Sequence, residues 1–459
     1  MSEMGSPTAN IDRFQKLRPL GALEQFSSAR HHLGFYHNVG ISATYSHVTE
    51  VNALSSLEDV ILKAVAAVVQ KHPILLAIVI DEDSPNPYFA RLPSIDIREA
   101  VTFLKRETTY IKDQTDIEID RILEDQHNKG FKTSFGKLPF WRLIIVTNSD
   151  VEFVASFIFH HSLGDGASGL VFHKDFLAGL QDKTLALVST VVHPRQTDLL
   201  PNLELLHPLP IQTPKPALVH ANLWSGREVT MPTQSHFRSL FLSQSTSQGF
   251  VQACKSHGTT VTATIPVIMA IALMENIEAS FDEVECTVPV SLRRWMPNII
   301  NEDSFGVWID AFSQYYHREN VSTFSWDEAR RSRETISEYL KSDGQCINVA
   351  KFQKIKDMRE FFLSRVGKER GTSFDVSNLG GIKAGQQEGS DWTMGRVVFG
   401  RSAFVSGSAI AVGVVSGMDG CLSLGFSWQE GVVGNDLMEK LMQRILDEID
   451  SIACTREVL

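Results

Sequence analysis

Two adjacent histidines and an aspartate in one short stretch of the chain could carry acid–base chemistry. His160 and His161 follow an apolar run, and Asp165 stands between Gly164 and Gly166. Histidine is the natural general base near neutral pH because its unperturbed pKa is about 6.5. The close grouping of these five residues favours catalysis over the alternative that both histidines are ordinary strand-end residues.

The elements around this stretch place it at a strand-to-helix junction. The apolar run at residues 153–158 predicts a buried strand, and residues 169–172 predict the start of a helix. Open α/β sheets hold their ligands at such junctions. We expect the glycines to permit a tight turn at which a side chain would clash.

Other kinds of site share parts of this pattern. Residues 164–169 match the G-x-G-x-x-G spacing of a dinucleotide loop, but Asp165 would lie where a pyrophosphate has to approach. His160, His161 and Asp165 are potential metal ligands, yet adjacent residues on a strand point to opposite faces, so the two histidines are poorly placed to share an ion. The G-x-S-x-G elbow of an α/β-hydrolase does not occur in the sequence. We therefore expect neither a dinucleotide nor a metal here.

Composition narrows the class of protein further. The 459 residues include 54 acidic and 43 basic ones, and the net charge of −11 argues against a nucleic-acid partner. Five cysteines without metal-ligand spacing indicate free thiols in a reducing compartment. Residues 1–10 lack the apolar core of a signal peptide, and the longest apolar stretch, residues 263–274, is too short to span a bilayer. We expect a cytoplasmic monomer.

The length of the chain predicts two domains, because single hydrophobic cores stop growing at roughly 250–300 residues. Six prolines crowd residues 193–216, and prolines suppress both helix and central strand. We therefore interpret residues 191–220 as a crossover linker between domains at residues 1–190 and 221–459.

Hydrophobic patterning predicts the remaining elements. Strands are expected at residues 35–45, 74–80, 89–91, 139–146, 238–242, 286–292, 304–312, 374–379, 397–404, 409–415 and 422–426. Helices are expected at residues 115–128 (on the surface), 245–257, 262–274, 325–340, 351–370 and 436–452. A further helix should begin with a capping box of Ser55 and Glu58 and end before Pro73.

The central motif resembles a known family signature. His160-His161-Ser162-Leu163-Gly164-Asp165-Gly166 is similar to the H-H-x-x-x-D-G motif of the chloramphenicol-acetyltransferase-like superfamily, which includes plant BAHD enzymes, peptide-synthetase condensation domains and fungal alcohol acetyltransferases. Other family motifs have counterparts in the same order: Arg18-Pro19-Leu20-Gly21 with Glu24, Lys71-His72-Pro73-Ile74-Leu75, Pro289-Val290-Ser291-Leu292-Arg293 and Ser377-Asn378-Leu379-Gly380. The plant D-F-G-W-G motif is absent, so the resemblance favours the fungal alcohol acetyltransferase family.

This resemblance implies a fold and a reaction. The fold would be α/β, with two domains that each contain a mixed β-sheet flanked by helices and an active-site tunnel between them, and late strands would cross to the first domain. The reaction would transfer an acyl group, most simply acetyl, from the co-substrate acetyl-CoA to a hydroxyl of a small-molecule alcohol or secondary metabolite, directly within a ternary complex and without a metal. A peptide-synthetase-like condensation or N-acyl transfer, and a non-catalytic ligand-binding member of the fold, remain alternatives.

The resemblance also implies roles for individual residues. The catalytic set is His161, Asp165 and Gly166, and the substrate-binding set is His160, Arg293, Ser377 and Asn378. His161 would be the general base, and Asp165 would pair with Arg293, or else with Arg294, to fix the loop. His160 would support the turn, and Ser377 and Asn378 would stabilise the oxyanion. The CoA phosphates could meet the basic residues Lys351, Lys354, Lys356, Arg359 and Arg365.

Overall fold

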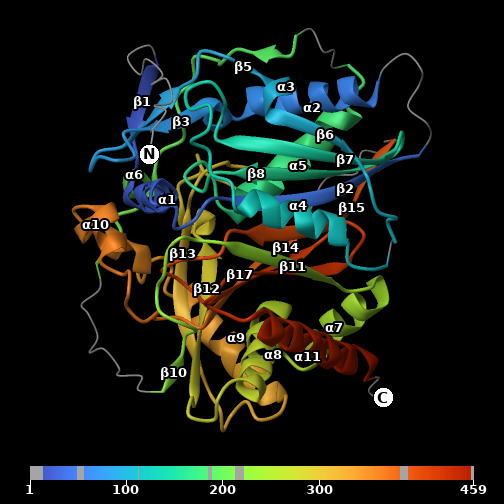
Figure 1. Ribbon diagram of the computed structural model, residues 1–459, viewed down its shortest axis with the longest axis vertical. Helices are drawn as coiled ribbons and strands as arrows, with labels where there is room; N and C mark the ends of the chain where they lie inside the picture. The colour runs from blue at the N-terminus through green and yellow to red at the C-terminus, as the bar shows by residue number, and fades with distance from the viewer. Residues whose placement is uncertain are drawn as a thin grey trace, which may run out of the picture.

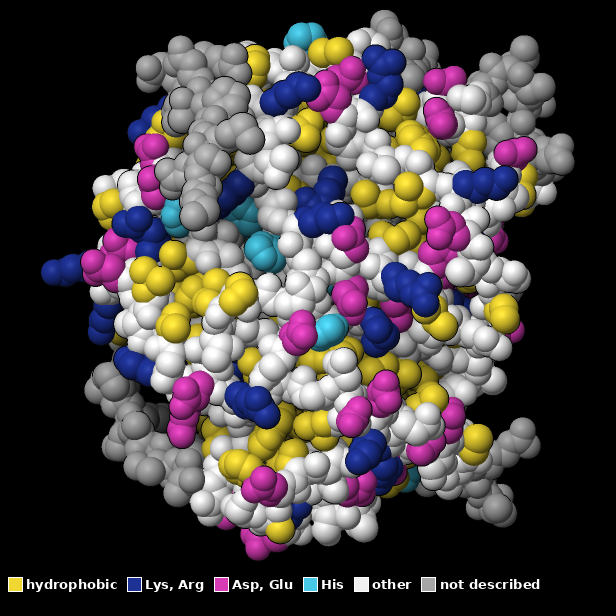
Figure 2. Space-filling view, viewed as in Figure 1, with side chains coloured by type: hydrophobic (Ala, Val, Ile, Leu, Met, Phe, Trp, Pro, Cys, Tyr) yellow, Lys and Arg dark blue, Asp and Glu magenta, His cyan; other side chains and the backbone are white. Residues whose placement is uncertain are grey.

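The computed structural model describes residues 14–48, 56–111, 113–184, 189–211, 222–382 and 391–455. Figure 1 shows two halves stacked along the long axis, the N-terminal half above and the C-terminal half below, each with its own sheet. On the face shown in Figure 2, acidic and basic side chains are interspersed over both halves. Each half buries a separate large hydrophobic cluster, so the chain has more than one core.

The N-terminal sheet has the strand order β15-β2-β8-β7-β6 among the described residues. Its strands are β2 (Val39–His47), β6 (Val101–Lys105), β7 (Trp141–Ser149), β8 (Glu152–Phe159) and β15 (Trp392–Arg401). The sheet is mixed, because β6 and β7 run parallel and the other neighbours run antiparallel. The helices of this half are α1 (Ala22–His32), α2 (Leu57–Lys71), α3 (Ile97–Ala100), α4 (Ile117–His127) and α5 (Gly166–Gln181).

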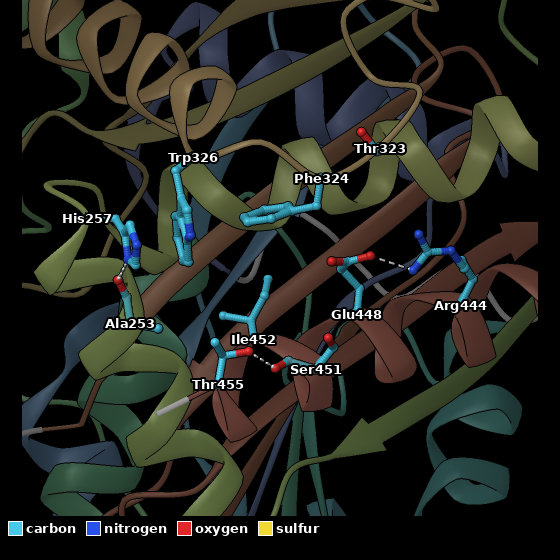
Figure 3. Close-up of a pocket in the computed structure, with 10 residues that line it drawn as sticks. All are labelled: Ala253, His257, Thr323, Phe324, Trp326, Arg444, Glu448, Ser451, Ile452 and Thr455. Atoms are coloured by element: carbon cyan, nitrogen blue, oxygen red, sulfur yellow. Dashed lines mark hydrogen bonds and ion pairs between the residues drawn. The ribbon is translucent and has the colours of Figure 1, made fainter. Parts of the chain in front are cut away.

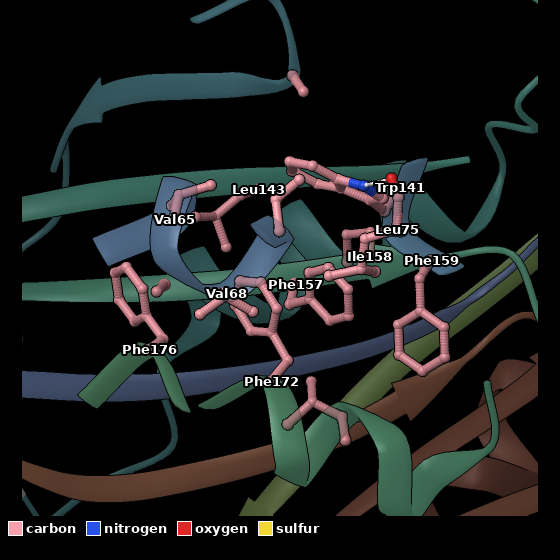
Figure 4. Close-up of a cluster of buried hydrophobic side chains, with 14 of the residues drawn as sticks. Val65, Val68, Leu75, Trp141, Leu143, Phe157, Ile158, Phe159, Phe172 and Phe176 are labelled. Carbon is pink, nitrogen blue, oxygen red and sulfur yellow. Dashed lines mark hydrogen bonds between the residues drawn. The ribbon is translucent and has the colours of Figure 1, made fainter. Parts of the chain in front are cut away.

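Aromatic packing joins the strand before the histidine motif to the helix after it. Phe157 of β8 and Phe172 of α5 stack with their ring centroids 3.7 Å apart. Val65 and Val68 of α2 lie in the same buried cluster, as Figure 4 shows. These side chains fix β8 and α5 relative to each other, and so they fix the loop between them.

The C-terminal sheet has the order β10-β12-β14-β16-β17-β11, and β13 pairs with β12. Its strands are β10 (Leu223–Trp224), β11 (Ser235–Phe241), β12 (Glu283–Ser291), β13 (Ile309–His317), β14 (Phe374–Gly381), β16 (Ile410–Ser416) and β17 (Leu422–Gln429). The helices that lie below this sheet in Figure 1 are α7 (Gln244–Ser256), α8 (Val261–Asn276), α9 (Trp326–Lys341) and α11 (Asn435–Cys454). Both parallel and antiparallel pairs occur, so this sheet is also mixed.

Smaller elements complete the described chain. The short strands are β1 (Gln15–Pro19), β3 (Ala77–Ile80) and β4 (Tyr88–Arg91), which form one sheet, and the pair β5 (Ile95–Asp96) and β9 (Val191–Val192). The short helices are α6 (Leu203–Leu206), α10 (Met358–Leu363) and the 3₁₀ turns η2 (Pro73–Leu76), η3 (Arg293–Trp295) and η4 (Asn348–Lys354). No single helix among the described residues is long and apolar enough to cross a membrane; α7 and α8 pass that test only as a pair bent by 101°.

Most predicted elements are confirmed by the structure. Those that overlap their predicted ranges are β2, β4, β7, β8, β11, β12, β14, β15, β16 and β17, together with α2, α4, α5, α7, α8, α9 and α11. In the predicted linker, β9 and α6 span only two and four residues, and residues 212–220 lie outside the described chain. The domain boundaries themselves stay a prediction.

Several predicted elements were wrong in extent or place. Residues 73–76 form a 3₁₀ turn, because Pro73 fixes its φ angle there, and only Ala77–Ile80 continue as a strand, at the edge of the three-stranded sheet. The cap of α2 is Ser56, whose side chain accepts a hydrogen bond from the Asp59 N–H, and Ser55 lies outside the described residues. The predicted strand at 304–312 begins only at Ile309.

Two predicted helices also differ from the structure. The basic segment at 351–370 contains only the end of η4 and the short helix α10. The helix α4 was predicted to lie on the surface, but it buries one face, including Ile119 and Leu123, between the two halves of the chain. Its acidic residues explain the difference, because Asp120 hydrogen-bonds the backbone and side chain of Ser239 in β11.

The strand β15 connects the two halves of the chain. It comes from late in the sequence but pairs antiparallel with β2 in the N-terminal sheet. Gly413 of β16 and Gly425 of β17 are register partners, and a Cβ on Gly413 would lie 2.5 Å from the carbonyl oxygen of Phe399 in β15. A Cβ on Gly425 would come closer still to the same oxygen. The two glycines therefore permit the backbones of the two sheets to meet.

We expect Gly413→Ala to lower the free energy of unfolding by about 1–3 kcal/mol, because the added methyl group must push β15 away from β16. Urea denaturation followed by circular dichroism would measure the change. Gly371→Ala is the matched control, since nothing lies within 4 Å of its Cβ position. If both variants unfold at the same urea concentration, the close approach of the two sheets is not a constraint on stability.

Candidate active site

A cavity of about 390 Å³ lies between the two halves of the chain. Its walls come from α1, from the start of α5 and from strands β12, β13, β14 and β15. The predicted site residues that line it are His161, Asp165, Gly166, Ser377 and Asn378. The other two, His160 and Arg293, are buried and do not line the cavity. The tertiary structure therefore brings residues from both halves together at one cavity.

The His161 ring lines the cavity as a neutral imidazole near pH 7. Burial, helped by the Arg30 guanidinium, lowers the pKa of His161 to about 4, while its own backbone carbonyl and Asp165 act in the opposite direction. Its ring centroid is 5.8 Å from that of Tyr36. The sequence could supply only the pKa of a free imidazole, and burial is the reason for the lower value. A neutral ring can accept a proton from a bound hydroxyl group.

Asp165 forms a bidentate ion pair with Arg293. The two guanidinium nitrogens Nη1 and Nη2 donate to Oδ2 and Oδ1 at 2.8 and 2.9 Å, and both side chains are almost completely buried. Oδ1 also accepts the Ser168 N–H as the N-cap of α5, and Oδ2 accepts the Trp308 N–H. Burial alone would raise the pKa of Asp165, but Arg293 and these N–H groups hold it below its ordinary value. The carboxylate is saturated with hydrogen bonds, so it fixes the loop and is not a proton donor.

A loop at residues 304–308 closes over the start of α5. The Ser168 hydroxyl donates to the carbonyl of Gly306 at 2.9 Å and accepts the Gly306 N–H at 3.1 Å, and the Asp165 N–H donates to the same carbonyl. Phe305 packs against Phe157 and Phe159 of β8. Hydrophobic patterning predicted a strand for this segment. The pattern did not indicate that the segment holds the start of α5 in place.

The glycines of the motif leave space for their neighbours. A Cβ on Gly164 would lie 2.6 Å from the Cβ of Ser168 and 2.7 Å from the ring of Phe305, and one on Gly166 would lie 2.6 Å from Leu379. Gly166 is the first residue of α5, and neither glycine has a positive φ. Close packing therefore requires a glycine at position 164, whereas a side chain at position 166 would have to displace the end of Leu379. Backbone conformation requires glycine at neither position.

His160, Glu82 and His31 form a buried cluster beside the cavity. The Glu82 carboxylate lies 3.6 Å from Nε2 of His160 and 3.5 Å from Nδ1 of His31. The other ring nitrogens are acceptors, since His160 Nδ1 takes the Ser162 N–H and His31 Nε2 takes the Phe131 N–H, both at 2.9 Å. In each ring, a proton therefore lies on the nitrogen that faces Glu82.

The ligand atoms of this cluster are spaced as in a metal site, but the protons on the ring nitrogens do not suit metal binding. Its three ligand atoms lie within 4.8 Å of one another. A metal ion needs a lone pair on each ligating nitrogen, whereas both rings present N–H groups to the carboxylate, and His160 does so in its neutral form. Burial lowers the pKa of His160 to about 4, which favours that neutral form. Burial would raise the pKa of Glu82, but the two histidines hold it below its ordinary value. The arrangement fits a carboxylate that orients His160 and the turn at Ser162.

Ser377 and Asn378 lie side by side on β14 but differ in their hydrogen bonds. The Asn378 amide donates to the Thr262 hydroxyl at 2.9 Å and accepts the Gly380 N–H at 2.8 Å. Within the described part of the chain, no residue hydrogen-bonds the Ser377 hydroxyl, which lines the cavity. Ser377 is therefore the more available donor of the pair.

The opening motif of the sequence holds α1 against the cavity. Arg18 donates to both carboxylate oxygens of Glu24 at 2.8 Å, and Glu24 accepts the Gly21 N–H. The Ala22 N–H donates to Glu204 in the linker at 2.8 Å. These contacts fix the start of the helix whose later turns line the cavity.

The basic segment that could meet CoA phosphates lies beside the cavity. Phe352 of η4 lines the cavity, and the lysines around it are exposed, namely Lys351, Lys354 and Lys356. Arg359 pairs with Asp357 at 3.2 Å, and Arg365 is half-buried. Phosphate binding by these residues stays a prediction.

A second pocket of about 470 Å³ lies between α7, α11 and the start of α9. Figure 3 shows Arg444 and Glu448 facing each other there, and they pair at 2.6 Å. His257 stacks on Trp326 with ring centroids 4.0 Å apart. None of the predicted site residues lines this pocket, and Arg444 and Glu448 pair with each other, so the predicted chemistry maps to the cavity between the halves.

Two mixed sheets, a cavity between them and an H-H-x-x-x-D-G loop define the chloramphenicol-acetyltransferase-like, or condensation, fold. The trichothecene 15-O-acetyltransferase TRI3 of Fusarium sporotrichioides aligns over 97% of both chains with a TM-score of 0.69 and 14% identity. The first condensation domain of the calcium-dependent antibiotic synthetase aligns over 96% of this chain and 97% of that chain, with a TM-score of 0.64 and 13% identity. The fold class predicted from the sequence is thus confirmed.

The chain belongs to the alcohol acetyltransferase family and is an acetyltransferase. The model of that family matches residues 19–213 and 220–448. A probable alcohol acetyltransferase of Aspergillus fumigatus, crmB, is 38% identical over 450 residues, which cover 93% of this chain and 97% of the relative. The resemblance drawn from the motifs is therefore confirmed at the level of the family.

We expect Asp165→Asn to destabilise the protein by about 3–5 kcal/mol, because it keeps the helix cap but leaves the Arg293 charge buried and unpaired. Urea denaturation would measure the loss. Asp96→Asn is the matched control, because Asp96 pairs with the exposed Arg98 and also caps a helix, so its loss should cost less than about 1 kcal/mol. Equal stabilities of the two variants would show that the buried pair does not hold the loop.

Proposed function

We propose that this protein transfers an acetyl group from acetyl-CoA to a hydroxyl of a small-molecule alcohol, with His161 as the general base. The observation that carries the proposal is a neutral, buried imidazole that lines a cavity between two halves. The Asp165–Arg293 pair holds the loop that presents this imidazole. Membership of the alcohol acetyltransferase family supports the class of reaction.

The reaction requires one proton to move twice. His161 takes the proton of the acceptor hydroxyl while the hydroxyl oxygen forms a bond with the thioester carbonyl carbon, whose π electrons move onto the carbonyl oxygen. When this tetrahedral intermediate collapses, the carbon–sulfur bond breaks, and His161 returns the proton to the departing thiolate. The products are the ester and CoA. Because both substrates would meet in one cavity, proximity contributes to the rate and an acyl-enzyme is not required.

The developing oxyanion needs a hydrogen-bond donor in the cavity. Ser377 is the better of the two predicted donors, since its hydroxyl has no partner among the described residues whereas the Asn378 amide is held by Thr262. Such a donor is typically worth about 2.7–4 kcal/mol in the transition state. Asn378 would then position Ser377 through β14.

The proposal also covers the class of acceptor, the oligomeric state and the cellular location. TRI3 is named as an O-acetyltransferase, and an oxygen acceptor such as a secondary metabolite fits the proposed base here. We infer that the protein acts as a monomer in the cytoplasm, where acetyl-CoA is available, and that it needs no metal.

We expect His161→Ala to lower kcat by about 10²–10⁴-fold, because the acceptor hydroxyl would lose its base. Release of CoA from acetyl-CoA in the presence of a panel of alcohols, followed with a thiol reagent, would measure this rate. His317→Ala is the control, since that side chain is half exposed at the end of β13 and outside the cavity. Wild-type activity in His161→Ala would reject the proposed base, and the absence of CoA release in the wild type with every alcohol would favour a non-catalytic role.

The low pKa of His161 predicts the pH dependence of the reaction. A histidine base works in its neutral form, so activity falls only as the pH drops below the pKa of about 4. We expect kcat/KM to show no acid limb between about pH 8 and about pH 5, in contrast to the value of about 6.5 for a free imidazole. Circular dichroism at each pH would verify that the protein stays folded. An acid limb near the free-imidazole value would contradict the buried, neutral state of His161.

A further inference from the structure

Arg30 places a positive charge in the cavity without a carboxylate partner. It lies on α1 and lines the cavity with Leu23, Phe26 and Ser27, which share its face of the helix. Its Nε atom is buried and has no hydrogen-bond partner, and no described residue forms an ion pair with the guanidinium. Burial lowers the pKa of Arg30 to about 10, so the side chain still carries its charge at neutral pH.

Aromatic rings hold the guanidinium in place. Its central carbon lies 4.4 Å from the ring centroid of Phe26, 4.6 Å from that of Tyr36 and 5.6 Å from that of Phe404. Stacking of this kind fixes an arginine while leaving its N–H groups free at the edge. Ring contacts alone offset only part of the cost of burying a charge. The guanidinium is therefore held ready for an anionic oxygen.

The neighbouring charges do not neutralise Arg30. Arg401 also lies over the Phe404 ring, at 5.4 Å, but it pairs with Asp375. Arg401 acts on Arg30 as a like charge, and no carboxylate contributes to the pKa of Arg30. This part of the cavity thus has two guanidinium groups and one carboxylate beside it.

The charge lies close to the proposed base. Arg30 and His161 both contact the Tyr36 ring, and Arg30 acts electrostatically on His161. The Tyr36 hydroxyl is also buried without a partner among the described residues, and burial raises its pKa to about 12, so it stays a neutral donor. Of these two groups, only Arg30 lines the cavity, so it is the donor beside the base that an oxygen-rich group of a substrate can reach.

We propose that Arg30 binds a carboxylate of the acceptor, so that the preferred acceptors are hydroxy acids. The phosphates of acetyl-CoA fit less well, because the pantetheine arm separates them from the thioester that must reach His161. A transient oxyanion fits less well too, because it would leave the buried charge of Arg30 unpaired in the complex with substrate. The proposal rests on the acetyltransferase function proposed above, and it adds the class of the acceptor.

Matched acceptors test this proposal. We expect the wild type to acetylate 4-(hydroxymethyl)benzoate with a lower KM than 1,4-benzenedimethanol, in which a hydroxymethyl group replaces the carboxylate. Arg30→Gln should raise the KM for the hydroxy acid by about ten- to a hundredfold and leave the KM values for the diol and for acetyl-CoA unchanged, as the loss of a charge-assisted hydrogen bond predicts. Arg30→Lys should restore part of the preference, and Arg98→Gln, on the surface, should behave as the wild type.

Two kinetic results would overturn the proposal. An equal loss of kcat for both acceptors in Arg30→Gln would place Arg30 at the thioester oxygen, and a rise in KM for acetyl-CoA alone would place it at the phosphates. Calorimetric titration of His161→Ala with 4-(hydroxymethyl)benzoate separates this question from catalysis. If the double variant, which carries both His161→Ala and Arg30→Gln, no longer binds this ligand, the carboxylate site is supported even when no acetyl transfer is found. If the double variant still binds it, the carboxylate site is rejected.

Discussion

The buried ion pair between Asp165 and Arg293 is the interaction on which the site depends. It joins the loop after β8 in the N-terminal half to the turn η3 that follows β12 in the C-terminal half, so it exists only when both halves are folded and docked. A buried pair repays its desolvation only when its geometry is good and its remaining hydrogen bonds are satisfied. Both conditions hold here, because the guanidinium is bidentate and Ser168 and Trp308 supply N–H groups to the carboxylate.

The other contacts between the halves also fix the relative positions of the residues around the cavity. The 304–308 loop closes on Ser168 through Gly306, and β15 crosses from late in the chain to pair with β2. Gly413 and Gly425 allow the backbone of β15 to approach the C-terminal sheet. The cavity is therefore bounded by two sheets that are connected on more than one side, which fixes the position of His161 relative to β14.

Burial disfavours the charged forms of His161, Arg30 and Asp165 alike, but the outcome differs among the three. It favours the neutral form of His161, which is the form that the proposed base requires. It also makes the unpaired charge of Arg30 costly, and a bound anion would relieve that cost. Asp165 escapes the effect of burial because it has a full set of partners. The presence or absence of a fixed partner thus separates a structural charge from one that is available to a ligand.

The sequence by itself determined the local features of this protein. It identified the H-H-x-x-x-D-G loop, the strand before it, the helix after it and the family, because hydrophobic periodicity and contiguous motifs are local properties. Its errors were also local, as at Pro73, where a continuous apolar run concealed a 3₁₀ turn. The pairing of Asp165 with Arg293 came from family resemblance and not from patterning.

Only the tertiary structure decided which distant residues share the cavity and which charges have partners. Arg30 and Glu82 belong to no motif, and the sequence gives no sign that one lacks a partner while the other lies between two histidines. The low pKa of His161 is likewise a property of its surroundings. Burial and electrostatics depend on which segments meet in space, and segments that meet here, such as α1 and β14, are hundreds of residues apart in the chain. The sequence thus specified the chemical groups, and the packing of the two halves set their charge states and their partners.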